Sequence, residues 1–91
     1  MSDAIAYLER AQELLGERGK SYDGENGERY MASAVAAFNA ITGHTLTEGD
    51  GWLMLQVVKD CRQWRRPEFH RDSAEDCVAY AALKAEALAR T

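Results

Sequence analysis

The sequence predicts an all-α fold, a compact four-helix bundle made by one domain that spans residues 1–91. Apolar residues recur at intervals of three and four along four segments, which is the spacing of one face of an α-helix. No stretch alternates with the period of two that is typical of a strand. Glycines and one proline separate the four segments. The predicted helices cover residues 3–16, 28–42, 48–65 and 73–90.

The first two predicted helices are amphipathic and are separated by a glycine-rich stretch. Ser2 or Asp3 can cap the first helix, and Gly16 and Gly19 are expected to end it. The second helix is expected to stop at Gly43. Its apolar positions are Met31, Ala34, Val35, Phe38 and Ile41. Residues 19–27, GKSYDGENG, can be either a flexible connector or a functional loop.

The third helix is predicted to be the central element of the bundle. Thr47 and Asp50 form the pattern of a capping box at its start. At about 100° per residue, its apolar side chains fall on one continuous arc, opposite Gln56, Lys59 and Gln63. The arc comprises Leu53, Met54, Val57, Val58, Cys61 and Trp64. We therefore expect a helix that is buried nearly all round at its start and on one side at its end.

The fourth helix is predicted to pack closely against the third because it is rich in alanine. Asp72 is expected to cap this helix, with Glu75 at the third helical position. The inner face is expected to include Cys77, Val78, Tyr80 or Ala81, Ala82, Ala85 and Leu88.

Length and charge limit the function of this chain. A chain of 91 residues leaves much of its surface exposed, so self-association into a homo-oligomer is expected to complete the core. The net charge of −4 argues against binding of a long nucleic acid. Five Lys or Arg nevertheless lie between residues 59 and 71, against two acidic residues. This local basic rim can suit a phosphate or another small anion, or it can be a solvated helix end.

The sequence predicts a soluble, cytoplasmic protein that neither enters nor binds a membrane. We find no signal peptide and no run of 18 apolar residues. Cys61 and Cys77 form no CxxC motif and have no histidine at zinc spacing, so buried free thiols are expected.

Two charged pairs are the first candidates for chemistry. Lys59 and Arg62 lie three residues apart on one helix face, where they can hold phosphate oxygens or pair with acids. Asp72 and Asp76 lie four residues apart and can hold a divalent cation such as Mg²⁺. Asp72 can equally serve only as a helix cap that complements the helix dipole.

Three further residues complete the predicted site. His70 lies just before Asp72 and is a candidate phosphate ligand. Tyr22 in the glycine-rich stretch can stack on a base, and Glu28 can add a third carboxylate to the metal site. No Ser/His/Asp arrangement is legible, so the sequence indicates no nucleophile.

The chain also resembles a family of small phage and prophage proteins of unknown function. The resemblance covers roughly three-quarters of the chain, and the final motif is its most specific part. The matching elements are Lys20–Gly24, Ile41–Gly43, Leu46–Asp50, Trp52–Leu55, Lys59–Arg62, His70–Ser73 and Asp76–Ala82. A phage-encoded protein would lie in the host cytoplasm.

That family is in turn distantly similar to the MazG-like all-α nucleotide pyrophosphohydrolases. These helical bundles hold Mg²⁺ over a triphosphate with acidic pairs on facing helices. Here Glu25 with Glu28, and Asp72 with Glu75 and Asp76, come nearest to such pairs. The resemblance therefore implies a Mg²⁺-dependent nucleotide site, either catalytic or degenerate.

Two other hypotheses compete with the nucleotide site. Small acidic phage proteins can act as counter-defence inhibitors of the anti-CRISPR type, which bind a host defence protein. Here the acidic surface of the first helix, with Glu9, Glu13 and Glu17, would meet a basic partner. Alternatively, the polar residues only fix the register of a structural oligomer.

Overall fold

The computed structural model describes residues 3–18 and 30–90, and this part of the chain folds into four α-helices without a strand. They are α1 (Ala4–Arg18), α2 (Tyr30–Thr42), α3 (Glu48–Trp64) and α4 (Arg71–Ala89). The predicted all-α, four-helix bundle is confirmed. None of the described helices is long and apolar enough to span a membrane.

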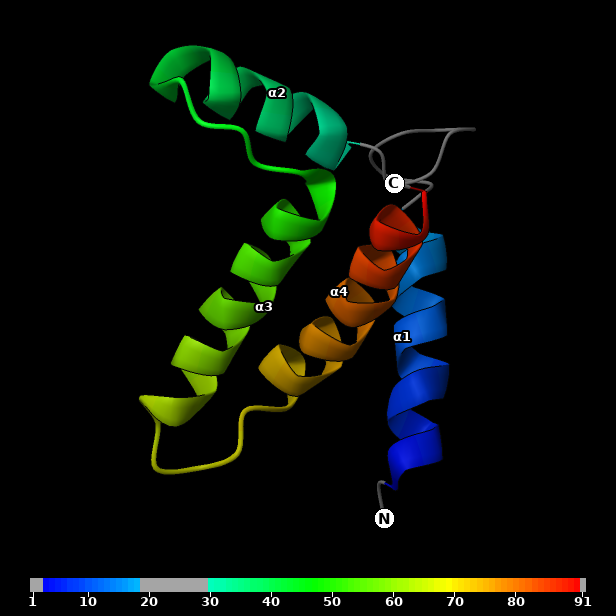
Figure 1. Cartoon of the computed structure of the whole chain (residues 1–91). Coiled ribbons are helices and arrows are strands. Elements are labelled where there is room, and N and C mark those ends of the chain that lie inside the picture. Colours follow the sequence, from blue (N-terminus) through cyan, green and yellow to red (C-terminus); the bar gives the residue numbers. More distant parts are fainter. Residues whose placement is uncertain (1–2, 19–29, 91) are drawn as a thin grey trace.

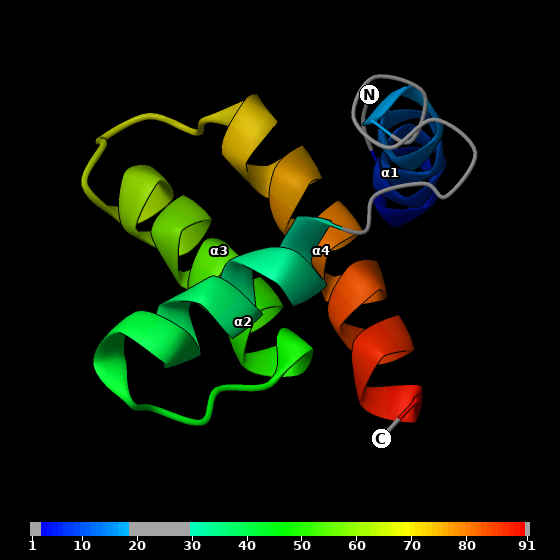
Figure 2. The ribbon, with the colours of Figure 1, turned by 90° about the horizontal axis from the view of Figure 1, so that it is seen from above.

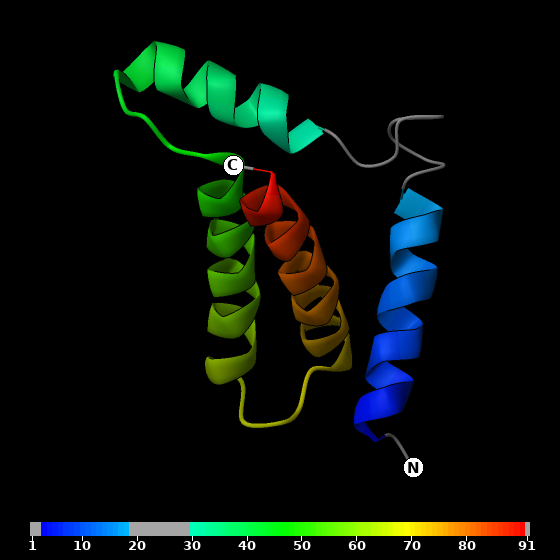
Figure 3. The same ribbon diagram turned by 45° about the vertical axis from the view of Figure 1, so that its right-hand side comes forward.

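An antiparallel hairpin of α3 and α4 forms the middle of the fold (Figure 1). α1 packs along the side of α4 that faces away from α3 (Figure 3). α2 crosses the N-terminal end of α3 at a steep angle, as the view from above shows (Figure 2). α4 is therefore covered by helices on two sides, whereas α3 has one long side that no described helix covers.

The core is small and is centred on Trp52, which is only 2% exposed. The indole stacks on the ring of Tyr80 at 5.7 Å and meets the edge of the Tyr30 ring at 5.7 Å. The remaining buried members of this cluster are Met31, Val35, Leu83 and Ala87. Residues of α2, α3 and α4 thus meet at one point, near the end of the hairpin where α2 crosses.

Local signals in the sequence set several helix ends as predicted. Asp3 caps α1, since its carboxylate accepts a hydrogen bond from the Ala6 N–H at 2.9 Å. The capping box of α3 is present: the Asp50 N–H donates to Thr47 Oγ1, and the Thr47 N–H donates to Asp50 Oδ2. α2 ends next to Gly43, whose φ of +78° favours glycine.

Two predicted boundaries are wrong. α1 continues through Gly16 to Arg18, because a single glycine weakens a helix without ending it. α4 begins at Arg71, so Asp72 lies in its first turn and does not cap it. His70 takes the N-cap position without a side-chain cap, and its N–H donates to Gln63 Oε1 at 2.7 Å. A residue of α3 therefore sets where α4 starts.

The predicted burial of α3 is also wrong. The side of α3 that faces α4 carries Trp52, Gln56 and Lys59, and it is largely polar beyond the tryptophan. The apolar arc lies on the other side, where its large side chains are 39–84% exposed. The arc consists of Leu53, Met54, Val57, Val58, Cys61 and Trp64.

The inner face of α4 also differs from its prediction. Its buried residues are Ser73, Glu75, Ala79, Leu83 and Ala87. Leu88, Ala82 and Ala85 are exposed, while Cys77 and Tyr80 are half-buried. Two helices, α1 and α3, pack on opposite sides of α4, so small and polar residues are buried where one apolar stripe was expected.

We predict that Trp52→Ala lowers the free energy of unfolding by about 3–5 kcal/mol, because it empties the centre of a small core. Urea unfolding followed by circular dichroism measures the change. Trp52→Phe should cost less, and Ile5→Ala on the exposed side of α1 should stay within about 0.5 kcal/mol of the unsubstituted chain. Equal effects of Trp52→Ala and Ile5→Ala would contradict this account of the core.

Candidate functional site

A pocket of about 340 Å³ lies between the C-terminal half of α3 and the first turns of α4. Its volume is in the range of small-molecule sites. The lining residues are Lys59, Asp60, Gln63, Trp64, Phe69, Ser73, Ala74 and Cys77. The pocket therefore combines one cation, one carboxylate, neutral hydrogen-bonding groups and two largely exposed aromatic rings.

Lys59 and Asp76 form an ion pair across the hairpin at the edge of this pocket. Lys59 Nζ lies 2.9 Å from Asp76 Oδ2, and each side chain is only 15% exposed. The sequence analysis proposed this pairing as one alternative for Lys59, and the structure shows it. Because the pair is shielded from water, its attraction is stronger than that of a surface pair. A phosphate bound by Lys59 would have to compete with Asp76.

His70 and Gln63 join the start of α4 to α3. His70 Nδ1 and Ser73 Oγ are 2.6 Å apart within a hydrogen bond, and the Gln63 side-chain amide donates to the Glu68 carbonyl at 3.1 Å. The first turn of α4, which no side chain caps, borders the pocket at Ser73 and Ala74. The N–H groups of a first helical turn favour anions.

Cys77 lies beside Asp60 on the facing helix. Its Sγ is 3.7 Å from Asp60 Oδ1 and 4.0 Å from the Gln56 carbonyl oxygen. Burial raises the pKa of the Cys77 thiol, and the negative charge of Asp60 raises it further. The thiol is therefore protonated at neutral pH and is a poor nucleophile.

Other predicted site residues do not converge on this pocket. Arg62 and Asp72 are exposed and do not line it. Tyr22 and Glu28 lie outside the described residues. Within residues 3–18 and 30–90, no three His, Cys, Asp or Glu side chains group in a way that could hold a metal ion.

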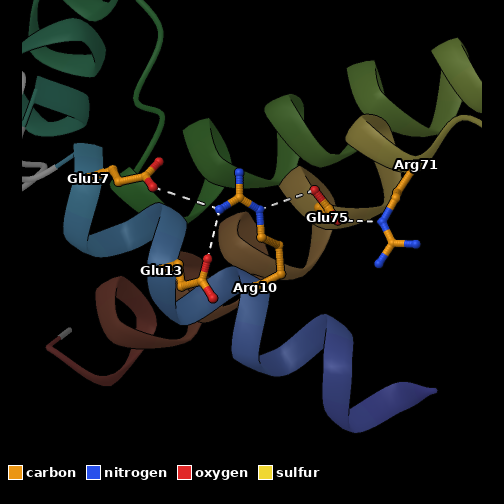
Figure 4. A network of polar contacts seen from close by, with 5 residues as sticks. All are labelled: Arg10, Glu13, Glu17, Arg71 and Glu75. Atoms are coloured by element: carbon orange, nitrogen blue, oxygen red, sulfur yellow. Dashed lines mark hydrogen bonds and ion pairs between the residues drawn. The ribbon is translucent and has the colours of Figure 1, made fainter. Parts of the chain in front are cut away.

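A second polar cluster, which the sequence analysis missed, joins α1 to α4 (Figure 4). Glu75 is buried, and its carboxylate forms ion pairs with Arg71 Nε at 2.8 Å and with Arg10 Nε at 3.5 Å. Arg10 also contacts Glu13 at 2.9 Å and Glu17 at 3.8 Å. Two of the acids expected to meet a basic partner thus share a positive charge from their own helix. Nothing in the sequence alone placed Arg10 opposite Glu75, 65 residues away along the chain.

Pocket residues such as Gln63, Ser73 and Cys77 were also missed as site residues. The signal for Gln63 was available, because Gln56, Lys59 and Gln63 share one side of α3. A polar side of that length on a helix next to another helix indicates polar partners there.

Comparisons of the chain with protein-family models, curated proteins and solved structures gave no match. The resemblance to phage proteins and to MazG-like enzymes therefore stays a prediction.

We predict that Lys59→Met lowers the free energy of unfolding by about 1–3 kcal/mol, because it leaves the Asp76 carboxylate shielded without its cation. Asp76→Asn alone should also destabilise the chain. The double variant should cost less than the two single changes added together, since they share one interaction. Additive effects in a double-mutant cycle would rule out coupling between these side chains.

We also predict that Asp60→Asn makes Cys77 react several-fold faster with a thiol reagent at pH 8. Removing the charge of Asp60 lowers the thiol pKa and raises the thiolate fraction. The rate should rise with pH in both proteins and reach its plateau at lower pH in the variant. The measurement uses a Cys61→Ser background, with Glu9→Gln on α1 as the control. An unchanged rate would show that Asp60 does not act on this thiol.

Proposed function

We propose that the pocket between α3 and α4 binds a nucleotide or a closely related phosphate-bearing small molecule. The single observation that supports this proposal most is the composition of the pocket. It places Lys59 and the uncapped start of α4 next to two exposed aromatic rings, Trp64 and Phe69. A phosphate binds to cations and helix N-termini, and a base stacks on aromatic rings.

The phosphate end of the ligand would lie at Lys59, Ser73 and the first turn of α4. The Ser73 hydroxyl is bonded to His70 Nδ1, so it can donate its hydrogen to a phosphate when the histidine ring is the donor in that contact. The first N–H groups of α4 add the positive end of the helix dipole. Arg62 is exposed on α3 three residues from Lys59 and does not line the pocket, so it can contribute only its positive charge from outside. The competing charge of Asp76 limits what Lys59 contributes by itself.

Mg²⁺ would reduce that competition. Protein-bound Mg²⁺ is often held by only one or two carboxylates together with the phosphates of the nucleotide, so a complete cage of protein ligands is not needed. Asp60 lines the pocket, Asp76 lies at its edge through its contact with Lys59, and Asp72 lies one turn earlier on α4. The metal would thus enter the site bound to the nucleotide, and the phosphates and the protein carboxylate would both be its ligands.

The base end would lie on the exposed aromatic rings. Stacking of a base on an aromatic side chain is worth about 1–3 kcal/mol, and it discriminates little between bases. The Asp60 carboxylate and the second N–H of the Gln63 side-chain amide are the polar groups that can form further hydrogen bonds there. The proposal therefore specifies a ligand class and leaves the base open.

We predict that isothermal titration with nucleoside mono-, di- and triphosphates detects binding that is tighter in the presence of Mg²⁺. Trp64→Ala should weaken it at least about tenfold, as expected for the loss of one stacking contact. Ile41→Ala is the matched control, because Ile41 is 83% exposed and Trp64 is 84% exposed, and Ile41 lies outside the pocket.

Asp76→Asn should reduce the effect of Mg²⁺ on affinity. Analysis of the titrated mixture for monophosphate and pyrophosphate shows whether the bound triphosphate is cleaved between its α- and β-phosphates. Binding without cleavage agrees with a degenerate site. No binding of any of these nucleotides at millimolar concentration, with or without Mg²⁺, would refute the proposal.

A further inference from the structure

The uncovered side of α3 is the largest feature that the candidate site does not explain. We call it the α3 arc, and it consists of Leu53, Met54, Val57, Val58, Cys61 and Trp64. All six residues are exposed. From residue 53 to residue 64, the charged side chains of α3 are Lys59, Asp60 and Arg62, and at about 100° per residue none of them falls on this arc.

An apolar groove extends the α3 arc toward α2. It has a volume of about 550 Å³ and is lined by Met31 and Val35 at the core, by Phe38 and Leu46 at the rim, by the Asp50 carboxylate at the start of α3, and by part of the arc. Leu53, Met54 and Val57 belong to both the groove and the arc. The groove and the arc therefore form one continuous and mainly apolar surface, which runs from α2 along most of α3.

We propose that a second copy of this chain covers this surface. The chain has few buried apolar side chains of its own, and most of its large hydrophobic residues on α3 face outward. Every folded molecule of this protein exposes this surface, so a partner that covers it must be present whenever the protein is. A copy of the same chain meets that condition, and a symmetric pair is the commonest soluble oligomer.

Charge supports the same occupant. Each chain carries a net charge of −4, so two copies repel each other over most of their surfaces. The α3 arc is the side of the hairpin where two copies can approach without placing like charges opposite each other. The one carboxylate that lines the groove, Asp50, is engaged in the capping box of α3, so this surface offers a basic partner protein little.

The spacing of the arc fits a two-fold axis near Val57. Leu53 and Cys61 lie four residues on either side of Val57, on the same side of the helix. If two α3 helices cross antiparallel at Val57, Leu53 of one copy lies opposite Cys61 of the other. α3 has 17 residues and is about 25 Å long, so the contact can extend along more than four helical turns.

Sedimentation equilibrium over a concentration series tests the dimer. The unsubstituted chain should sediment as a dimer, and Val57→Glu should weaken the association at least a hundredfold, because it places two carboxylates at the axis. Ile5→Glu, on the exposed side of α1, is the control and should leave the dimer intact. Val57→Glu should keep its helical circular dichroism, since the side chain is exposed in the single chain.

Disulfide trapping tests the orientation. In a Cys77→Ser background, Leu53→Cys should form a disulfide with Cys61 of the second copy, because an antiparallel pair brings these positions within the 4.4–6.8 Å that a disulfide needs between Cα atoms. Mass spectrometry of the cross-linked peptide identifies the pair. A monomer at every concentration would overturn the proposal, and so would a dimer that Val57→Glu leaves intact. Trapping of Cys61 only with Cys61 would overturn the antiparallel arrangement.

Discussion

The polar contact between α3 and α4 is the constraint on which the rest of the structure depends. Lys59 meets Asp76, and Gln63 meets the start of α4 at His70. Buried polar groups are costly unless they are paired, so these contacts allow one register and one relative rotation of the two helices. With that rotation set, Trp52 faces Tyr80 in the core and the α3 arc faces outward.

This arrangement places two different surfaces on opposite sides of one helix. The side toward α4 carries the candidate ligand pocket, which contains Lys59 and Asp60 and borders the start of α4. The opposite side carries the uncharged arc, which we assign to a second copy of the chain. The two proposals rest on different residues, apart from Trp64, which belongs to both surfaces. Either proposal can still fail without the other, because the pocket also depends on Lys59 and the arc is centred on Val57, and neither residue belongs to the other surface.

The second polar cluster has a mainly structural role. Glu75 lies on the side of α4 that faces α1, and Arg10 reaches it from α1 (Figure 4). Arg71 contacts the same carboxylate and also lies over the ring of Tyr7, with its guanidinium carbon 5.2 Å from the ring centre. These contacts hold α1 against α4, on the far side of the hairpin from the α3 arc. They leave the arc uncovered, because α1 is not available to pack there.

By itself, the sequence determined the number of helices, most of their boundaries and the residues that begin and end them. Such features depend on neighbours within a few positions, as the Thr47–Asp50 capping box and Gly43 show. The division of α3 into an apolar and a polar side was also legible from periodicity. The tertiary structure decided which side faces α4, and the assumption that apolar residues turn inward gave the wrong answer. The burial of a helix face depends on the surface that meets it, and here Asp76 and His70 offered the polar side of α3 its partners.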